Sequence, residues 1–314
     1  MSDAGVGAST DSAAGKGARP GRAWTVCAMM IAAMFLSESP AVAQAPQPGQ
    51  QVILVTGSTD GLGRVVALRL ARTGAHVIVH GRNRERGNAV VAEIQQEGQG
   101  SARFYAADFG SMDQVREFAE TILRDYDRLD VLVNNAGIWM DDPERPVSAD
   151  GYELHFAVNY LSGFLLTRVL LPRLIESAPS RIVNVASAAQ RPIDFDDVML
   201  ENEYDDSWAY AQSKLAQIMF TIDLAQELEG TGVTVNSLHP ATLMNTSMVQ
   251  GIGREPVSTI DEGAEAVVNL VLSENVGNGE YYNGLRLATP NNQALDAEAR
   301  RRLKELSEQL TGLR

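Results

Sequence analysis

Residues 51–63 read QVILVTGSTDGLG and join a short β-branched run to a glycine-rich turn. The run Gln51–Thr56 predicts a buried strand. In Gly61–Thr73 apolar residues recur at helical spacing and Gly74 follows as a stop signal, which predicts a helix. Glycines between a strand and a helix permit close backbone approach, and a helix N-terminus offers free N–H groups and a positive dipole end. This stretch therefore predicts a strand–turn–helix unit that binds a pyrophosphate; the alternative is a purely structural turn.

The same alternation of strand and helix continues to the end of the chain. Strands are predicted at Gln51–Thr56, His76–Val79, Ala102–Ala106, Leu129–Asn134, Arg181–Ala186, Val233–Leu238 and near Glu280–Arg286. Helices are predicted at Gly61–Thr73, Arg84–Glu97, Met112–Tyr126, about Tyr152–Glu176, Ser207–Glu229, Glu262–Leu272 and Asp296–Leu310. Strands that alternate with long helices imply right-handed crossovers and a parallel sheet. We predict one α/β domain over residues 51–314, a Rossmann fold with a doubly wound, mostly parallel, seven-stranded sheet and helices on both faces.

The first 50 residues differ in composition from the rest. Residues 1–22 are rich in Gly, Ala and Ser with basic residues toward the end, Ala23–Leu36 is an uncharged apolar run, and Ala41-Val42-Ala43 follows. This order predicts a secretory signal peptide over residues 1–43, before a linker over residues 44–50. The apolar run is shorter than the roughly 20 residues that span a bilayer. The alternatives are a disordered extension or a start codon placed too early.

Localisation depends on that choice. A signal peptide in use makes the mature chain periplasmic or secreted, whereas a start at Met29, Met30 or Met34 leaves a cytoplasmic protein. Cleavage after Ala43 would also remove Cys27, the only cysteine.

The overall composition excludes several classes of protein. Lys and Arg number 26 against 40 Asp and Glu, and the net charge of −14 disfavours nucleic acids and anionic lipid surfaces as partners. The 45% hydrophobic content is typical of a globular protein. One cysteine allows no intrachain disulfide, and the four histidines show no metal-ligand spacing. We therefore expect a small-molecule substrate, no nucleic-acid partner, no bound metal and no stable membrane span in the mature chain.

Several motifs resemble those of the short-chain dehydrogenases/reductases, over about residues 51–314. The family patterns T-G-x-x-x-G-x-G, N-N-A-G and Y-x-x-x-K are matched by Thr56, Gly57, Gly61 and Gly63, by Asn134-Asn135-Ala136-Gly137, and by Tyr210 and Lys214. Ser187 lies 23 residues before Tyr210, where the family places its serine, and Asn159 lies on the long helix where the family has a fourth functional residue. The resemblance implies a nicotinamide-dependent oxidoreductase.

The four residues Asn159, Ser187, Tyr210 and Lys214 make chemical sense as a set. A carbonyl that accepts hydride needs a proton donor at its oxygen, and a phenol with a pKa of about 10 is a reluctant one. Lys214 follows Tyr210 by one helical turn, so its ammonium is expected to lower the pKa of the phenol. Ser187 would donate a hydrogen bond to the substrate oxygen. The resemblance implies that Asn159 holds a water in a proton relay; taken singly, each residue has an ordinary structural alternative.

Cofactor choice depends on the end of the second strand. Gly81 stands where NAD-preferring relatives carry Asp, and the guanidinium of Arg82 is suited to a 2′-phosphate. Asp60 counts against this, because some NADP-preferring relatives place a cation there. We expect NADP(H), with NAD(H) as the alternative; Asp108 is predicted to contact adenine or, alternatively, to serve the next helix N-terminus. The predicted cofactor contacts are Gly57, Ser58, Thr59, Asp60, Gly61, Leu62, Gly63, Arg82, Asn83, Asp108, Phe109, Asn135, Ala136, Gly137, Tyr210, Lys214, Pro240, Thr242 and Thr246.

Within the family, Ile193–Val198 and the tail Asp296–Gly312 resemble the retinol-dehydrogenase-like reductases, the group that includes protochlorophyllide reductase. This implies an apolar aldehyde, ketone or retinoid-like substrate. The chain departs from the family at Ala241, which replaces a glycine, and Leu243–Ile260 is predicted to form a substrate lid. The alternative function is a catalytically silent NAD(P)-binding sensor or assembly protein. Members of the family pair through the helices that correspond to Tyr152–Glu176 and Ser207–Glu229, which implies a homodimer or homotetramer.

Overall fold

The sheet lies at the centre of the computed structural model, which describes residues 45–313. Within these residues eight strands form one sheet in the order β3-β2-β1-β4-β5-β6-β7-β8. The strands are β1 (Val52–Val55), β2 (His76–Gly81), β3 (Ser101–Ala106), β4 (Val131–Asn134), β5 (Ser180–Val185), β6 (Val233–His239), β7 (Tyr281–Asn283) and β8 (Arg286–Leu287). All neighbouring pairs are parallel except β7 with β8. The chain reverses its winding between β1 and β4, so the sheet is doubly wound as predicted.

The predicted number of strands was one too few. The segment predicted as a single strand near Glu280–Arg286 is interrupted at Gly284, whose φ of 58° lies in the left-handed region. The chain turns back there, and β8 pairs with β7 in the antiparallel sense at the edge of the sheet. A glycine that permits this φ therefore converts one predicted strand into a hairpin.

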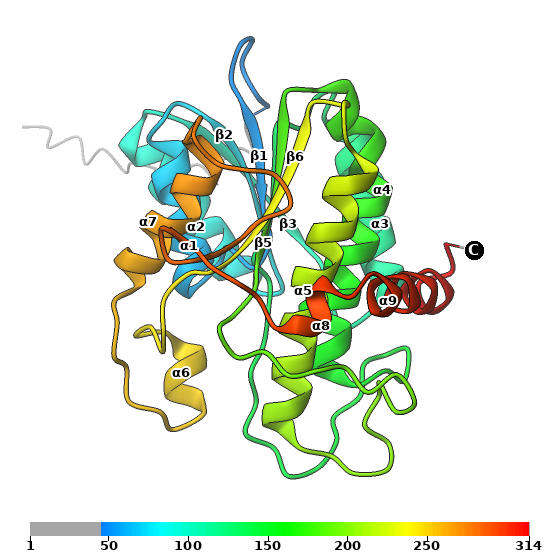
Figure 1. Ribbon diagram of the computed structural model, residues 1–314. Helices are drawn as coiled ribbons and strands as arrows, with labels where there is room; N and C mark the ends of the chain where they lie inside the picture. Colours follow the sequence, from blue (N-terminus) through cyan, green and yellow to red (C-terminus); the bar gives the residue numbers. More distant parts are fainter. Residues whose placement is uncertain (1–44, 314) are drawn as a thin grey trace, which may run out of the picture. The chain divides into compact units, whose positions relative to one another are not determined.

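Helices cover both faces of the sheet (Figure 1). One face carries α1 (Gly61–Ala71), α2 (Arg84–Glu97) and α7 (Ile260–Leu272), and the other carries α3 (Met112–Asp125), α4 (Ser162–Glu176) and α5 (Asp206–Glu227). Each face has its own hydrophobic core against the strands. The shorter α6 (Ser247–Gly251) and α8 (Asn292–Leu295), with α9 (Ala297–Leu310), complete the helices of residues 45–313. None of these helices has the length and apolar character needed to cross a membrane.

Side-chain caps start three helices directly after strands. Asp60 accepts a hydrogen bond from the N–H of Gly61 at the start of α1, and Asn83 and Ser111 cap α2 and α3. Caps of this type satisfy N–H groups that have no partner inside the helix. The N-termini of α1, α2 and α3 are therefore fixed at the carboxyl ends of β1, β2 and β3. The predicted signal peptide and its cleavage site, residues 1–43, lie outside the described residues.

The long predicted helix at Tyr152–Glu176 is not a regular α-helix throughout. Residues Phe156–Leu161 form a π-helical stretch, η1, that leads into α4. π-Helical turns widen the backbone locally and are frequent at functional sites. The predicted functional residue Asn159 lies inside this stretch.

The C-terminal helix α9 packs against η1 and α5. Ser307 hydrogen bonds with the hydroxyl of Tyr160 at 2.7 Å, and Arg300 forms an ion pair with Asp223 at 2.9 Å. A second ion pair joins Lys304 to a carboxylate of α5. The helices predicted to pair between subunits are thus partly covered by the chain itself, which leaves less of their surface for a second copy.

Candidate active site

The glycine-rich turn between β1 and α1 is tied to the end of β4. The hydroxyl of Thr56 accepts hydrogen bonds from the N–H groups of Asn135 and Ala136, both at 2.9 Å. The amide of Asn135 donates to the carbonyl oxygens of Thr56 at 2.8 Å and Gly57 at 3.2 Å. Two motifs that lie far apart in the sequence, Thr56–Gly63 and Asn134–Gly137, therefore form one surface at the carboxyl edge of the sheet.

Glycines in this turn allow the backbone contacts that a side chain would block. A Cβ on Gly57, whose φ is +63°, would lie 2.8 Å from the Cα of Ala136. A Cβ on Gly63 would lie 2.3 Å from the carbonyl oxygen of Gly57 and 2.4 Å from Nδ2 of Asn135. The first turn of α1 is thus held against the strand ends with its N–H groups available, which is the cradle that a pyrophosphate requires. The residues present fit a dinucleotide.

His80, at the end of β2, also positions the turn. Its Nδ1 accepts a hydrogen bond from the N–H of Gly57 at 3.1 Å, and its Nε2 lies 3.3 Å from the carbonyl oxygen of Ala107. Burial lowers the pKa of His80 to about 3, so the neutral ring donates through Nε2. Ser58 accepts from the N–H of His80 and donates to Val55. His80 was not among the predicted site residues, because nothing near it in the chain indicates a contact with Gly57.

The residues predicted to line the adenine end of the cofactor site make contacts within the chain. The side chain of Asn83 accepts from a backbone N–H as the cap of α2. Asp108 accepts from the N–H of Gly110 at 3.0 Å in the turn before α3, whereas the N-terminus of α3 itself is capped by Ser111. Phe109 is buried and stacks on His80 with ring centres 4.1 Å apart, so only its backbone remains for a cofactor contact. The adenine contact of Asp108 stays a prediction.

The charge of Asp60 is balanced within the chain. Its carboxylate accepts from the hydroxyl of Ser247 at 2.6 Å and pairs with Arg86 at 3.2 Å. The hydrogen bond from Ser247, with the contacts to Gly61 and Arg86, lowers the pKa of Asp60. Arg86 therefore offsets part of the negative charge of Asp60 beside the glycine-rich turn.

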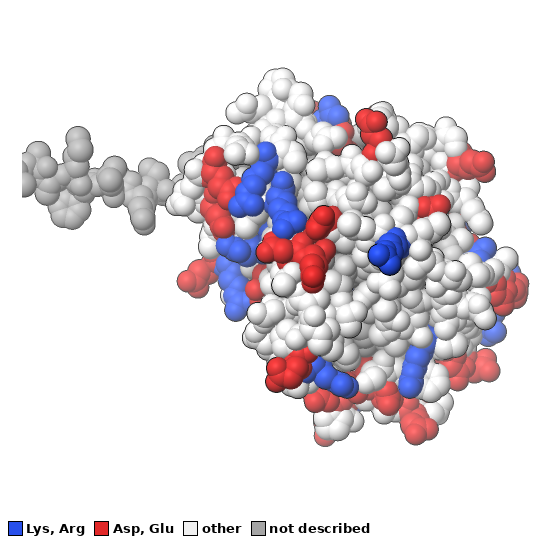
Figure 2. Space-filling model, turned by 60° about the vertical axis from the view of Figure 1, so that its left-hand side comes forward, with Lys and Arg blue, Asp and Glu red and all other residues white. Residues whose placement is uncertain are grey.

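Most arginines near Arg82 form ion pairs within the described residues, although Arg84 does not. Figure 2 shows basic and acidic side chains next to one another on the side of the molecule that carries α7, where Arg69 pairs with Asp261 and Arg72 with Glu97. Arg82 is exposed and forms no ion pair with any residue between 45 and 313. Its guanidinium is therefore available to an anionic ligand.

The segment after β6 closes on the glycine-rich turn. Thr242 bonds to the imidazole of His239 at 2.9 Å, and Thr246 caps α6 and lies beside Gly61. Pro240 is buried, and Met244 pairs with Ser258 across the predicted lid. The predicted lid Leu243–Ile260 is thus joined to the cofactor cradle through Thr246 and the Ser247–Asp60 hydrogen bond.

Ser187, Tyr210 and Lys214 come together beyond the carboxyl end of β5. Tyr210 and Lys214 lie on one face of α5, with Nζ of Lys214 5.6 Å from the centre of the phenol ring. Ser187 follows β5, and its hydroxyl acts to lower the pKa of the Tyr210 phenol. The three side chains are buried. Gly137 completes the group, because a Cβ there would lie 3.4 Å from Nζ of Lys214. The structure brings these predicted residues into one site.

The predicted lowering of the pKa of Tyr210 is not found, because the pKa of Tyr210 is raised above its ordinary value. Burial raises the pKa of Tyr210, and the hydroxyl of Ser187 only partly opposes this. The ammonium of Lys214 is held elsewhere, by the carbonyl oxygen of Val185 and Oε1 of Gln217, each at 3.0 Å. Burial lowers the pKa of Lys214 to about 7. Helical spacing placed the two residues on one face, but the buried surroundings outweigh their attraction.

The side-chain amide of Asn159 makes three hydrogen bonds within the chain. Its Oδ1 accepts from the N–H of Ile138 at 2.7 Å, and its Nδ2 donates to the carbonyl oxygen of Ile138 at 3.1 Å and to Ser213 at 3.0 Å. Asn159 therefore fixes the chain just after β4. The water relay implied for Asn159 stays a prediction.

The four histidines lie in separate surroundings. His76 contacts Ser101, and His155 contacts Glu153, in addition to the partners of His80 and His239 given above. No group of three or more His, Cys, Asp or Glu side chains in the described region is arranged to hold a metal ion.

Residues 51–257 match the family model described as short chain dehydrogenase. The chain therefore belongs to the short-chain dehydrogenase family, and it is an NAD(P)-dependent oxidoreductase. It is 39% identical over 286 residues to retinol dehydrogenase 13 of Mus musculus, covering 85% of each chain. It is 36% identical over 294 residues to retinol dehydrogenase 14 of Homo sapiens, covering 84% of this chain and 87% of that one. The predicted likeness to retinol dehydrogenases is confirmed.

Solved structures agree with this assignment. A short chain dehydrogenase from Shigella flexneri complexed with NADP superposes with a TM-score of 0.63 and 26% identity, covering 75% of this chain and 97% of that chain. A metagenomic short-chain oxidoreductase in complex with NADP gives a TM-score of 0.56 and 30% identity, covering 70% of this chain and 90% of that one. The predicted Rossmann fold is confirmed.

The buried Lys214 leads to a prediction about stability. Its pKa is about 7 in the folded chain and about 10.4 in an unfolded one. The unfolded chain therefore binds more protons between these values, so the burial cost is complete below pH 7 and disappears as the pH rises toward 10.5. Compared with Lys214→Met, the wild type should gain up to about 4 kcal/mol of unfolding free energy from pH 7 to 10.5.

Urea unfolding of both proteins across this pH range measures that gain. Lys304→Met is the matched control, because Lys304 is a partly exposed lysine paired with Glu227. A stability difference between the wild type and Lys214→Met that does not change with pH would contradict a depressed lysine pKa.

Proposed function

We propose that this chain is an NADP-dependent oxidoreductase that transfers hydride between NADP(H) and an apolar carbonyl or alcohol substrate. The observation that carries the proposal is the burial of Ser187, Tyr210 and Lys214 together beside a cradle built on Gly57 and Gly63. The NADP complexes of two structural relatives support the cofactor. The retinol dehydrogenases among the relatives support an aldehyde, ketone or retinoid-like substrate.

Several features of the chain favour NADP over NAD. The glycine turn and the first turn of α1 would hold the pyrophosphate, and Arg82 would pair with a 2′-phosphate. A Cβ on Gly81 would lie 2.6 Å from Cγ2 of Thr59, so this position leaves no room for the carboxylate that binds the ribose of NAD. When bound, the nicotinamide supplies or accepts the hydride.

The residues of the site would control the proton at the substrate oxygen. In reduction the hydroxyl of Tyr210 donates its proton to that oxygen, and in oxidation the phenolate takes the proton back. The hydroxyl of Ser187 acts to lower the pKa of Tyr210 and would orient the substrate oxygen beside it. Lys214, with a pKa of about 7, is partly charged at neutral pH and would stabilise the phenolate. The buried surroundings exclude water and so strengthen these interactions.

Titration of the full chain with NADPH and with NADH, followed by nicotinamide fluorescence, tests the cofactor proposal. NADPH should bind more tightly, and Arg82→Ala should weaken NADPH binding by about tenfold or more with little effect on NADH, because it removes charge-assisted hydrogen bonds. Arg286→Ala is the control, since Arg286 is also exposed but lies on β8, far along the sheet from β2. Tighter binding of NADH, or equal losses for both cofactors, would contradict the proposal. Oxidation of NADPH by aldehydes, ketones and retinoids then tests the reaction.

The compartment is a separate proposal that rests on residues 1–43 alone. We propose export to the periplasm or the exterior if the signal peptide is used, and a cytoplasmic enzyme otherwise. Immunoblots of fractionated cells that produce the full chain distinguish the two. A homodimer or homotetramer is likewise a proposal, which sedimentation of the purified protein tests.

A further inference from the structure

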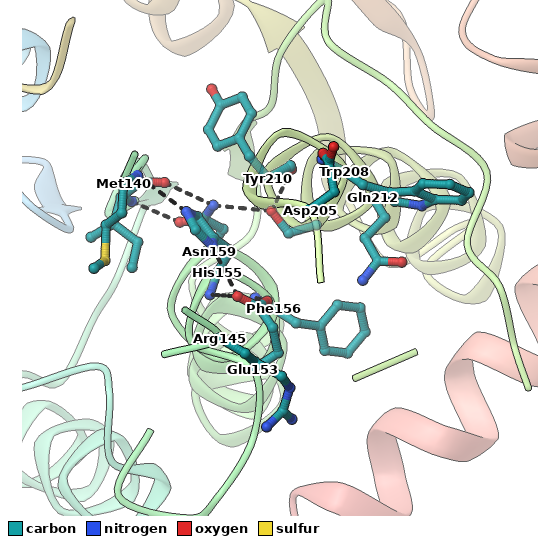
Figure 3. Close-up of polar contacts among 12 residues, drawn as sticks. Met140, Arg145, Glu153, His155, Phe156, Asn159, Asp205, Trp208, Tyr210 and Gln212 are labelled. Atoms are coloured by element: carbon teal, nitrogen blue, oxygen red, sulfur yellow. Dashed lines mark hydrogen bonds and ion pairs between the residues drawn. The ribbon is translucent and has the colours of Figure 1, made fainter. Parts of the chain in front are cut away.

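Two side chains in and just before η1 form hydrogen bonds with the segment that follows β4. Asn159 bonds both backbone groups of Ile138, and Nε2 of His155 accepts a hydrogen bond from the N–H of Met140 at 3.2 Å. His155 and Asn159 are four residues apart, so their side chains project from the same side of the helix toward this segment (Figure 3). The segment Ile138–Met140 is thus fixed on either side of Trp139.

His155 is itself held in one orientation and one tautomer. The ring is fully buried, and its Nδ1 lies 2.9 Å from Oε1 of Glu153. Because Nε2 accepts from Met140, the proton must be on Nδ1 and point at Glu153. Glu153 is also fully buried, and its carboxylate accepts from the N–H groups of His155 at 2.9 Å and Phe156 at 2.7 Å. Glu153 therefore orients the ring that holds Met140.

Trp139 lies flat against the phenol of Tyr210. The ring centres are 4.6 Å apart and the planes differ by 12°. The ring of His155 meets the same phenol edge-on, with centres 6.4 Å apart and planes at 86°. The position of Tyr210 is therefore set by aromatic contacts with the segment after β4 and with the helix that grips this segment.

We propose that Trp139 is a positioning residue for Tyr210, and that Asn159, His155 and Glu153 act as a clamp that keeps Trp139 in place. The inference rests on the proposed function of Tyr210 in proton transfer. A reacting group displaced by about 1 Å costs as much as a hundredfold in rate. Because the clamp orients the proton donor, its loss should lower kcat more than it changes KM.

Trp139→Ala in the full chain tests the positioning role. We expect kcat for carbonyl reduction to fall about tenfold or more, with KM and the NADPH dissociation constant changed less than about threefold. Trp139→Phe keeps a stacking ring and should recover most of the rate. Trp208→Ala is the control, since that indole is partly exposed and packs against Arg191 rather than Tyr210. An unchanged kcat in Trp139→Ala, or an effect confined to KM, would overturn the proposal.

Two His155 variants test the clamp. His155→Leu removes both hydrogen bonds and should lower kcat as Trp139→Ala does, whereas His155→Gln can still accept from Met140 and donate to Glu153 and should keep most of the rate. Combining His155→Leu with Trp139→Ala should cost clearly less than the sum of the two separate losses, because His155 acts on Tyr210 largely through Trp139. Fully additive losses would overturn the clamp.

Near-ultraviolet circular dichroism gives a readout that does not depend on turnover. His155→Leu keeps both Trp139 and Tyr210, so loss of the ring-coupling signal in that variant reports the loss of their stacking. We expect Trp139→Ala to lose this coupling signal together with the bands of the indole itself, and His155→Gln to keep the wild-type spectrum. A wild type that binds NADPH but reduces no carbonyl would contradict the proposed function, while the spectra would still decide whether His155 keeps Trp139 on Tyr210; an unchanged His155→Leu spectrum would overturn the inference.

Discussion

Tyr210→Phe should lower turnover by about a hundredfold to ten-thousandfold and leave NADPH affinity within about twofold of the wild type. The variant removes only the hydroxyl that would exchange a proton with the substrate oxygen. The phenyl ring remains stacked on Trp139, so the site keeps its shape. Steady-state reduction of an active carbonyl substrate and NADPH fluorescence titration measure the two quantities separately.

Tyr105→Phe is the matched control for this loss. Tyr105 lies on β3 at the other end of the sheet, where its hydroxyl donates to Asp125 at 2.8 Å. That variant should keep its turnover. If Tyr210→Phe retained wild-type turnover, another group would have to supply the proton, and the assigned function of Tyr210 would be wrong.

Gly63→Ala should abolish tight cofactor binding. The new methyl would lie 2.3 Å from the carbonyl oxygen of Gly57, a backbone atom that cannot move without shifting the turn. The start of α1 would then separate from the strand ends and the pyrophosphate cradle would open. We expect NADPH affinity to fall about a hundredfold or more and the unfolding free energy to fall by about 1–3 kcal/mol.

The expected decrease in stability of Gly63→Ala is opposite in sign to the usual effect of this substitution in a helix. Alanine in place of glycine inside a helix normally stabilises it by about 1 kcal/mol. Gly163→Ala in α4 is the control, because a Cβ there would make an ordinary contact of 3.5 Å with Asn134. Gly163→Ala should leave stability unchanged or raised and NADPH binding intact. A stabilised Gly63→Ala variant with normal affinity would show that the cradle does not depend on this close approach.

Local patterns accounted for most of the fold. Buried strands, helices with caps and a glycine turn between β1 and α1 are each encoded within a few neighbouring residues, and they lie within a few residues of their predicted positions. The hairpin of β7 and β8 and the π-helical stretch at Phe156–Leu161 were missed, because each is a small change of backbone path. Hydrophobic periodicity does not distinguish such changes from a regular strand or helix.

The amino-acid sequence by itself determined the doubly wound sheet, the family, and the meeting of Ser187, Tyr210 and Lys214, because motifs at strand ends converge on one edge of a parallel sheet. Only the tertiary structure decided the contact of His80 with the glycine turn, the stacking of Trp139 on Tyr210, and the pKa shifts of the buried pair. These depend on side chains from distant segments and on how much water the packed chain excludes. The spacing of residues along one helix or strand predicts neither the contacts between distant segments nor the exclusion of water.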